Sequence, residues 1–151
     1  MHGGKSHTQI TDEEYCERYM IIKEACLKNG VTVLQENVAR HRSGEFEFLK
    51  AMVDELGSNA EFCFDVKQAI RQGSDPLDLS QHFLDNIKHY HISDHSIASD
   101  CMLPCNGKFD FKTLFSRNNG RNDLSYMIEV YNNSYKSYSE ILDSYNKIIN
   151  L

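Results

Sequence analysis

Residues 61–92 read EFCFDVKQAIRQGSDPLDLSQHFLDNIKHYHI and predict a strand, a helix and a second strand in that order. The first four residues are mostly apolar and aromatic, which is typical of a buried strand. Asp75 and Pro76 mark a helix start, because aspartate caps a first turn and proline fits the first helical position. The apolar stripe of this helix covers Leu79–Ile87, and the second strand is expected near Lys88–Ile92. Such a unit predicts two parallel strands joined by a helix that covers one face of the sheet.

The same alternation continues on both sides of this stretch. Thr11 and Glu14 form a capping box that begins a helix, and Gly30 ends it. A second helix is expected after Ser43 and stops at Gly57. Two further strands are expected at Val31–Leu34 and Tyr126–Val130. Two further helices are expected at Lys112–Ser116 and Ser137–Ile149, and a long polar loop at Ser93–Lys108. Four strands that read as continuous apolar runs predict an α/β fold with a parallel sheet and flanking helices.

Composition limits the classes of function. The chain has 151 residues, of which 40% are hydrophobic, so one domain with a packed core is expected. Its net charge of −6 argues against nucleic-acid binding, which needs clustered Lys and Arg. No apolar stretch approaches about 18 residues and no secretory signal begins the chain, so no membrane is expected and the predicted location is the cytoplasm. The five cysteines lack the spacing of a disulfide framework, which favours reduced thiols.

Each expected strand ends in a possible metal ligand, namely Glu36, Asp65, His91 or Glu129. A single acidic residue after a strand is usually a helix cap or a solvated loop residue, and Asp65 could cap the segment that follows it. Four such residues at equivalent strand ends carry more weight, because the carboxyl ends of parallel strands meet at one edge of the sheet. Three crowded carboxylates repel one another unless a cation lies between them. Three oxygen ligands and one imidazole suit a divalent ion such as manganese, magnesium, cobalt or zinc.

Several segments carry a resemblance to a known family, namely Glu36-Asn37-Val38, Phe64–Ala69, His89–Asp94, Asp100–Phe111 and Ile128–Tyr131. Together they resemble the xylose-isomerase-like TIM-barrel superfamily, which includes sugar phosphate isomerases and epimerases and the enzymes of AP endonuclease family 2. The resemblance implies that residues 1–151 form a single partial TIM-barrel domain. This domain would run from the end of strand four, at Met1–Gly4, through helix eight, and would hold strands five to eight of a (β/α)8 barrel.

A half barrel of this kind raises the question of its partner. A complete barrel needs eight strands and about 250 residues. The resemblance therefore implies a fragment, a truncated gene product, or a half barrel that assembles as a homodimer or with an N-terminal half. Alone, it would expose the edges of its outer strands and an apolar face.

The resemblance also implies an activity, a metal-dependent isomerisation or epimerisation of a sugar or sugar phosphate. Glu36 and Glu129 would bind the metal and move a proton at a carbon next to a carbonyl. Asp65 and His91 would be metal ligands only, and His2 and Asp94 would touch the substrate or the ligands. The expected partner is a small sugar molecule.

Three alternatives stay open. An endonuclease-IV-like phosphodiesterase would need extra histidines for a three-metal cluster, and the matching positions hold Gln68 and Met102. A sugar-acid or cyclitol dehydratase could use the same metal site to eliminate water. The third alternative is a half barrel that is inactive or needs a partner.

Overall fold

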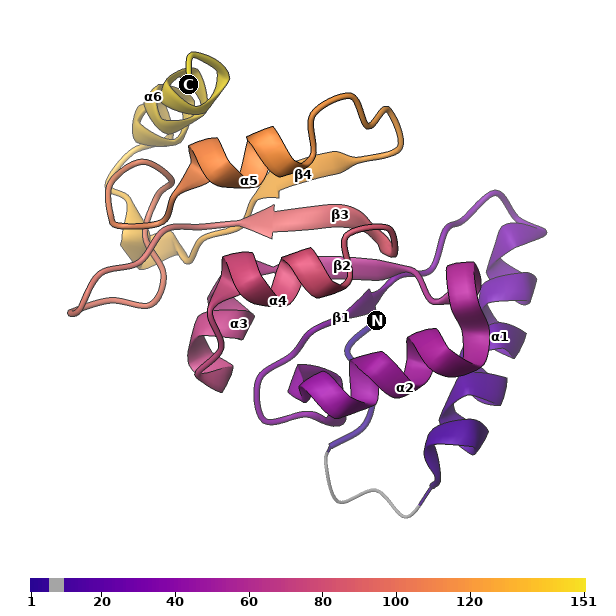
Figure 1. The fold of residues 1–151 in the computed structure, drawn as a ribbon. Helices are drawn as coiled ribbons and strands as arrows, with labels where there is room; N and C mark the ends of the chain where they lie inside the picture. Colours follow the sequence, from indigo (N-terminus) through magenta and orange to yellow (C-terminus); the bar gives the residue numbers. More distant parts are fainter. Residues whose placement is uncertain (6–9) are drawn as a thin grey trace.

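The computed structural model describes residues 1–5 and 10–151 and contains a four-stranded parallel sheet (Figure 1). The strand order is β1-β2-β3-β4, with the strands at Gln35–Glu36, Phe62–Asp65, Ile87–Ile92 and Ser125–Ile128. The helices are α1 (Asp12–Leu27), α2 (Phe46–Leu56), α3 (Val66–Gln72), α4 (Pro76–His82), α5 (Phe111–Arg117) and α6 (Tyr138–Ile149). Neighbouring strands follow one another along the chain and helices lie between them, which is the arrangement of half a (β/α)8 barrel.

The core lies between the helices and one face of the sheet. Phe62 and Phe64 of β2 belong to this core, together with Tyr90 of β3 and aromatic or aliphatic residues of five helices. Side chains alternate between the two faces of a strand, so Cys63 and Asp65 point to the opposite face. In a closed barrel that opposite face is the interior. The alternation therefore places apolar side chains against the helices and polar side chains on the inner face.

The predicted strands are present, and the boundaries of three of them differ from the prediction. The strand predicted at Val31–Leu34 lies instead at Gln35–Glu36, since the Val31 amide donates to the Cys26 carbonyl at the end of α1. Ile87 begins β3 rather than continuing α4, which ends at His82. The last strand begins at Ser125 and ends at Ile128, although the amide of Glu129 still donates to the Ile92 carbonyl of β3.

Helix α3 was not expected and begins directly after the aspartate that ends β2. The Oδ1 atom of Asp65 accepts a hydrogen bond from the Gln68 amide at 3.0 Å, which caps the first turn. Gly73 ends the helix in the left-handed conformation, with φ of 85°. Seven residues are too few to show a clear helical period. Asp65 therefore caps α3 through Oδ1, which was one of the two roles predicted for it, while Oδ2 faces His91.

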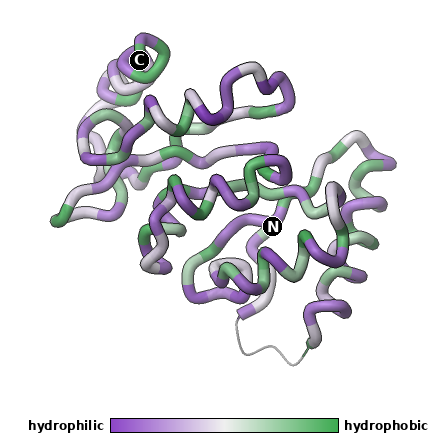
Figure 2. Tube along the Cα trace, viewed as in Figure 1, coloured by the Kyte–Doolittle hydropathy of each residue, from purple (hydrophilic) through white to green (hydrophobic). Residues whose placement is uncertain are grey.

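The two edges of the sheet differ. On the β1 side, the amide of Glu36 donates to the Met1 carbonyl, and Lys5 forms a single antiparallel bridge with His41. On the β4 side, α6 leaves its apolar face exposed, and the exposed fractions of Tyr138 and Leu142 are 81% and 58%. In the hydropathy colouring, hydrophobic and hydrophilic residues alternate along α6 (Figure 2). A groove of about 800 Å³ lies between β4 and α6 and is lined mainly by Tyr126, Ile128, Tyr138, Leu142, Tyr145 and Ile149.

Among the described residues, every helix is too short or too polar to cross a membrane.

A buried aspartate organises the long loop between β3 and α5. Asp94 accepts hydrogen bonds from the amides of His95, Gly107 and Phe109 at 2.7, 2.7 and 2.9 Å. Its backbone also pairs with Met102. The loop is therefore fixed around a single carboxylate.

Replacing Gly107 with alanine is expected to destabilise this loop strongly. A Cβ atom at this position would lie 2.2 Å from the His95 carbonyl oxygen and 2.4 Å from Asp94 Oδ1. Overpacking of this kind costs about 3 kcal/mol. The matched control is Gly120→Ala, where the new methyl group meets nothing within 4 Å and only its positive φ of 82° resists the change. Urea unfolding would compare the two variants, and equal losses of stability would contradict the steric argument.

Candidate metal centre

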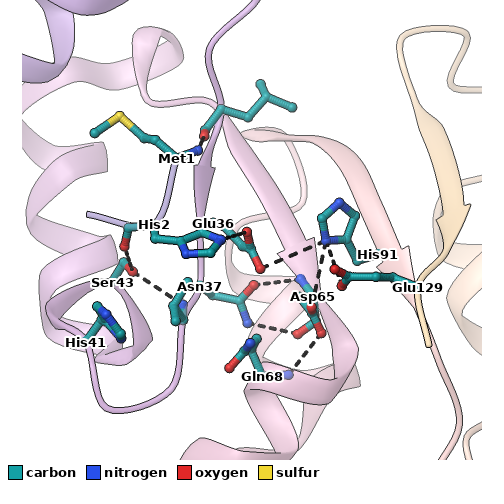
Figure 3. Close-up of polar contacts among 12 residues, drawn as sticks. Met1, His2, Glu36, Asn37, His41, Ser43, Asp65, Gln68, His91 and Glu129 are labelled. Carbon is teal, nitrogen blue, oxygen red and sulfur yellow. Dashed lines mark hydrogen bonds and ion pairs between the residues drawn. The ribbon is translucent and has the colours of Figure 1, made fainter. Parts of the chain in front are cut away.

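Four side chains meet at the carboxyl ends of the four strands (Figure 3). Glu36 and Asp65 are the last residues of β1 and β2, His91 lies near the end of β3, and Glu129 directly follows β4. One potential ligand atom from each of them lies within 4.8 Å of those of the other three. The Nδ1 atom of His91 is 3.1 Å from Glu129 Oε2 and 3.7 Å from Asp65 Oδ2. It is also 3.9 Å from Glu36 Oε1. All four residues expected from the strand ends thus share one cluster, which we call the four-ligand cluster.

Two atoms at the centre of this cluster have unused bonding capacity. Asp65 Oδ2 and His91 Nδ1 are buried and have no hydrogen-bond partner within the described part of the chain. Buried polar atoms are normally satisfied, because an unpaired one loses its interaction with water without compensation. Both atoms point toward the remaining carboxylates (Figure 3). A cation held by the four side chains would satisfy both, so the residues present fit a divalent metal ion.

Short hydrogen bonds fix the Asp65 main chain beside this centre. The Asp65 amide donates to Asn37 Oδ1 at 2.6 Å, and Asn37 Nδ2 donates to the Asp65 carbonyl at 3.0 Å. Asn37 follows Glu36 directly, so the same contact ties the end of β1 to the end of β2. The positions of two of the candidate ligands are therefore set by the backbone rather than by a bound ion.

Electrostatics show the crowding of negative charge. Burial, followed by the nearby Asp65 carboxylate, raises the pKa of Glu36. The Asp65 carboxylate, followed by the Cys63 side chain, raises the pKa of the His91 imidazole to about 10. Burial alone would raise the pKa of Asp65, but His91 and the other neighbours hold it below its usual value. The cluster therefore stabilises positive charge at its centre.

Lys67 also reaches the cluster, although it was not among the predicted site residues. This residue of α3 is only 3% exposed, and its Nζ atom lies 3.0 Å from Glu129 Oε2 and 3.4 Å from Asp65 Oδ2. Its Nζ atom also lies over the Tyr131 ring, 5.1 Å from the centroid. A buried lysine is rare unless it is paired with an opposite charge. In the sequence, a position two residues after Asp65 is the signal that could have suggested this pairing. Lys67 is therefore a built-in cation beside the candidate ligands.

The other two predicted site residues lie in different places. The Nε2 atom of His2 is 3.1 Å from Glu36 Oε2, on the opposite side of Glu36 from His91 (Figure 3). Asp94 uses its carboxylate to hold the loop after β3. Contact of His2 or Asp94 with a substrate stays a prediction.

The positions that matter for a three-metal cluster hold other side chains with structural contacts. Gln68 accepts a hydrogen bond from the Ala39 amide at 3.1 Å. Met102 pairs with the backbone of Asp94. Asp100 forms an ion pair with Arg71 at 2.5 Å, and both residues line a pocket with Val38–Arg40 of the loop after β1. These contacts give no additional imidazole to the four-ligand cluster.

Comparison with solved structures shows the same fold in several proteins. The probable 3-DHS dehydratase AsbF from Bacillus anthracis matches with a TM-score of 0.78 and 17% identity, over 100% of this chain and 62% of AsbF. The 3-keto-D-glucoside 4-epimerase YcjR from E. coli matches with a TM-score of 0.71 and 13% identity, over 95% of this chain and 57% of YcjR. The IOLI protein, solved with a zinc atom, matches with a TM-score of 0.66 and 20% identity, over 96% of this chain and 58% of that protein. The chain thus spans less than two thirds of the length of each of these proteins.

No curated protein matches the sequence. The family described as Xylose isomerase-like TIM barrel matches over residues 1–147, which is nearly the whole chain. The four parallel strands, the helices between them and the length relative to the solved structures agree with this match. The chain therefore belongs to the xylose isomerase-like TIM barrel family and has the fold of its C-terminal half barrel.

Proposed function

We propose that this chain carries the metal site of a sugar or sugar phosphate isomerase or epimerase. The observation that carries the proposal is the four-ligand cluster, in which Asp65 Oδ2 and His91 Nδ1 are buried and make ion-pair contacts but no hydrogen bond among the described residues. Glu36, Asp65, His91 and Glu129 would hold a divalent ion of the manganese, magnesium, cobalt or zinc type. When bound, the ion would polarise the carbonyl group of a sugar.

The two glutamates would move the proton at the carbon next to that carbonyl. Glu129 is the more accessible of them, since its side chain is 40% exposed whereas that of Glu36 is 10% exposed. The ammonium group of Lys67 holds Glu129 Oε2 at 3.0 Å and so orients the carboxylate. Burial and the nearby Asp65 carboxylate raise the pKa of Glu36, which favours the proton-carrying form of its carboxyl group. Glu129 would therefore remove the proton and Glu36 would return one from the other side.

The fold comparisons support this class of reaction without selecting the substrate. They include a 3-keto-D-glucoside 4-epimerase and a sugar phosphate isomerase/epimerase from Parabacteroides distasonis. The dehydratase among them keeps elimination of water as a second candidate reaction at the same site. A phosphodiesterase of the endonuclease IV type is disfavoured by Gln68 and Met102.

A two-stage experiment tests the proposal. Calorimetric titration of the EDTA-treated chain with Mn²⁺ should show one bound ion, and Glu129→Gln should weaken that binding. The loaded chain would then be incubated in D₂O with a panel of ketoses and their phosphates, and proton NMR would follow exchange at the carbon next to the carbonyl. The exposed Glu140→Gln variant is the control. Absence of metal binding would overturn the proposal, loss of water from a substrate would select the dehydratase, and binding without exchange would indicate a half barrel that needs a partner.

We also propose that the groove between β4 and α6 is covered in the active assembly, by a complementing N-terminal half barrel or by a second copy of the chain. Its lining is almost entirely apolar, and within residues 1–5 and 10–151 no strand pairs with the outer edge of β4.

We also propose a cytoplasmic location for the chain, because all five cysteines are free thiols, which persist in a reducing compartment.

Replacing Leu142 with lysine is expected to weaken any association of the chain through this groove by at least about tenfold, because a charge would be buried among apolar side chains. Asn146→Lys places the same charge at an exposed position of α6 outside the groove and should leave association unchanged. Sedimentation over a range of protein concentrations provides the measurement. A wild-type chain that stays monomeric at every concentration would rule out the homodimer and leave the complementing half.

A further inference from the structure

A second group of metal-ligand side chains lies beside the four-ligand cluster. Cys63, His89 and His91 each offer a ligand atom, and these atoms lie within 4.8 Å of one another. Cys63 is buried, while the two histidines are partly exposed. The proposed function uses His91 as a metal ligand and gives no role to Cys63 or His89.

The register of the sheet creates this group. A shift between Phe62 and Cys63 aligns Cys63 with His89, and Asp65 with His91. Residues two apart on a strand share a face, so all four side chains point to the inner face of the half barrel. Asp65 and His91 form a pair at the carboxyl ends of the strands, and Cys63 and His89 form the pair two residues earlier along each strand.

A hydrogen bond fixes the orientation of His89. Its Nδ1 atom lies 2.6 Å from the Ser125 hydroxyl of β4. With Nδ1 engaged by this partner, the Nε2 atom is left for a ligand, which is how outer-shell groups orient metal-binding histidines. The rings of His89 and His91 are nearly perpendicular, at 89°, with their centroids 5.1 Å apart.

His91 links the two groups. Its Nδ1 atom faces the three carboxylates, and its second ring nitrogen lies on the far side of the ring from them (Figure 3). The ligands differ in chemistry on the two sides of His91. The four-ligand cluster offers carboxylate oxygens, whereas the second group offers the Cys63 sulfur and imidazole nitrogens. Thiolate and imidazole select softer ions such as Zn²⁺, whereas carboxylates suit Mn²⁺ and Mg²⁺.

We propose that Cys63, His89 and His91 form a second cation site, of the zinc type, that shares the His91 imidazole with the four-ligand cluster. Three protein ligands leave a fourth position open to water. Binding deprotonates the Cys63 thiol and releases that proton to solvent. A neutral imidazole has one free lone pair, so an ion on this site and an ion on the four-ligand cluster compete for His91. Zn²⁺ at the second site therefore weakens Mn²⁺ binding at the four-ligand cluster.

Cobalt spectroscopy of the full chain tests this inference, because a thiolate bound to Co²⁺ gives an intense charge-transfer band in the near ultraviolet. The wild-type chain should show the band, and Cys63→Ser should lose it while still binding Mn²⁺ in a calorimetric titration. His89→Gln should weaken Co²⁺ binding at this site by about tenfold or more, the range seen when a supporting contact to a metal is lost. Cys101→Ser removes another buried cysteine and should keep the band.

Each result separates this inference from the proposed function. A Co²⁺ band without any Mn²⁺ binding would sink the proposed function and leave the second site standing. A wild-type chain that binds Co²⁺ without the band, or a band that survives in Cys63→Ser, would overturn the second site. Circular dichroism of each variant establishes that it is folded before it is titrated.

Discussion

Asp65→Asn is expected to lower the affinity for a divalent ion by at least about 100-fold, since loss of an outer-shell partner alone costs 10- to 100-fold. Asp65 is 1% exposed and sits at the centre of the cluster, with Oδ2 facing His91. Asparagine keeps the shape of the side chain but removes its charge. It also keeps the helix cap, because asparagine caps a helix about as well as aspartate.

The two roles of Asp65 can be separated with a second variant. Asp65→Ala removes the ligand and also the acceptor for the Gln68 amide at the start of α3, which costs about a further 1 kcal/mol of folding stability. Calorimetry with Mn²⁺ and urea unfolding in EDTA would measure the two effects. Both variants should lose metal binding, and only the alanine variant should lose the cap. Metal binding that survives in Asp65→Asn would remove Asp65 from the ligand set.

Lys67→Met is expected to make the fold depend on a bound cation. Methionine resembles the lysine stem in length and flexibility, so packing is largely preserved. The variant leaves the Asp65 and Glu129 carboxylates without their internal ammonium group. Removing one partner of a buried pair costs 3–5 kcal/mol, and the partial exposure of Glu129 reduces the expected loss to about 2 kcal/mol in EDTA.

The same variant should bind a divalent ion more tightly, by at least about tenfold, because a positive charge beside the site has been removed. Thermal unfolding with EDTA and with Mn²⁺ measures both effects, and the stabilisation by Mn²⁺ should be larger in Lys67→Met than in the wild type. Lys50→Met, at an exposed helical ion pair with Asp54, is the control and should leave the response to Mn²⁺ unchanged. Equal responses in Lys67→Met and the wild type would show that the ammonium group does not act on the cluster.

The sequence was sufficient for the strand–helix alternation and for the row of residues at the strand ends. Both depend on patterns that are local in the sequence: apolar runs, a capping box at Thr11 and Glu14, and a polar residue after each run. Because parallel strands bring their carboxyl ends together, Glu36, Asp65, His91 and Glu129 could be grouped before any coordinates existed.

Other features depend on distances along the sheet that no local pattern records. The shift that aligns Cys63 with His89 comes from pairing between strands, and the burial of Lys67 comes from residues more than sixty positions away at Glu129 and Tyr131. The misplaced first strand has a similar cause, since the amide of Val31 bonds to the end of α1 instead of to a neighbouring strand.

The unpaired edge of β4 has a consequence for how the chain behaves at high concentration. Ser125–Ile128 is a short edge strand whose Tyr126 and Met127 are exposed, and an exposed edge is a template for intermolecular β-pairing and fibril growth. The charged residues Asp123 and Glu129 flank this strand, and charges beside an apolar strand disfavour such stacking. A partner that covers this edge would therefore also protect the chain from aggregation.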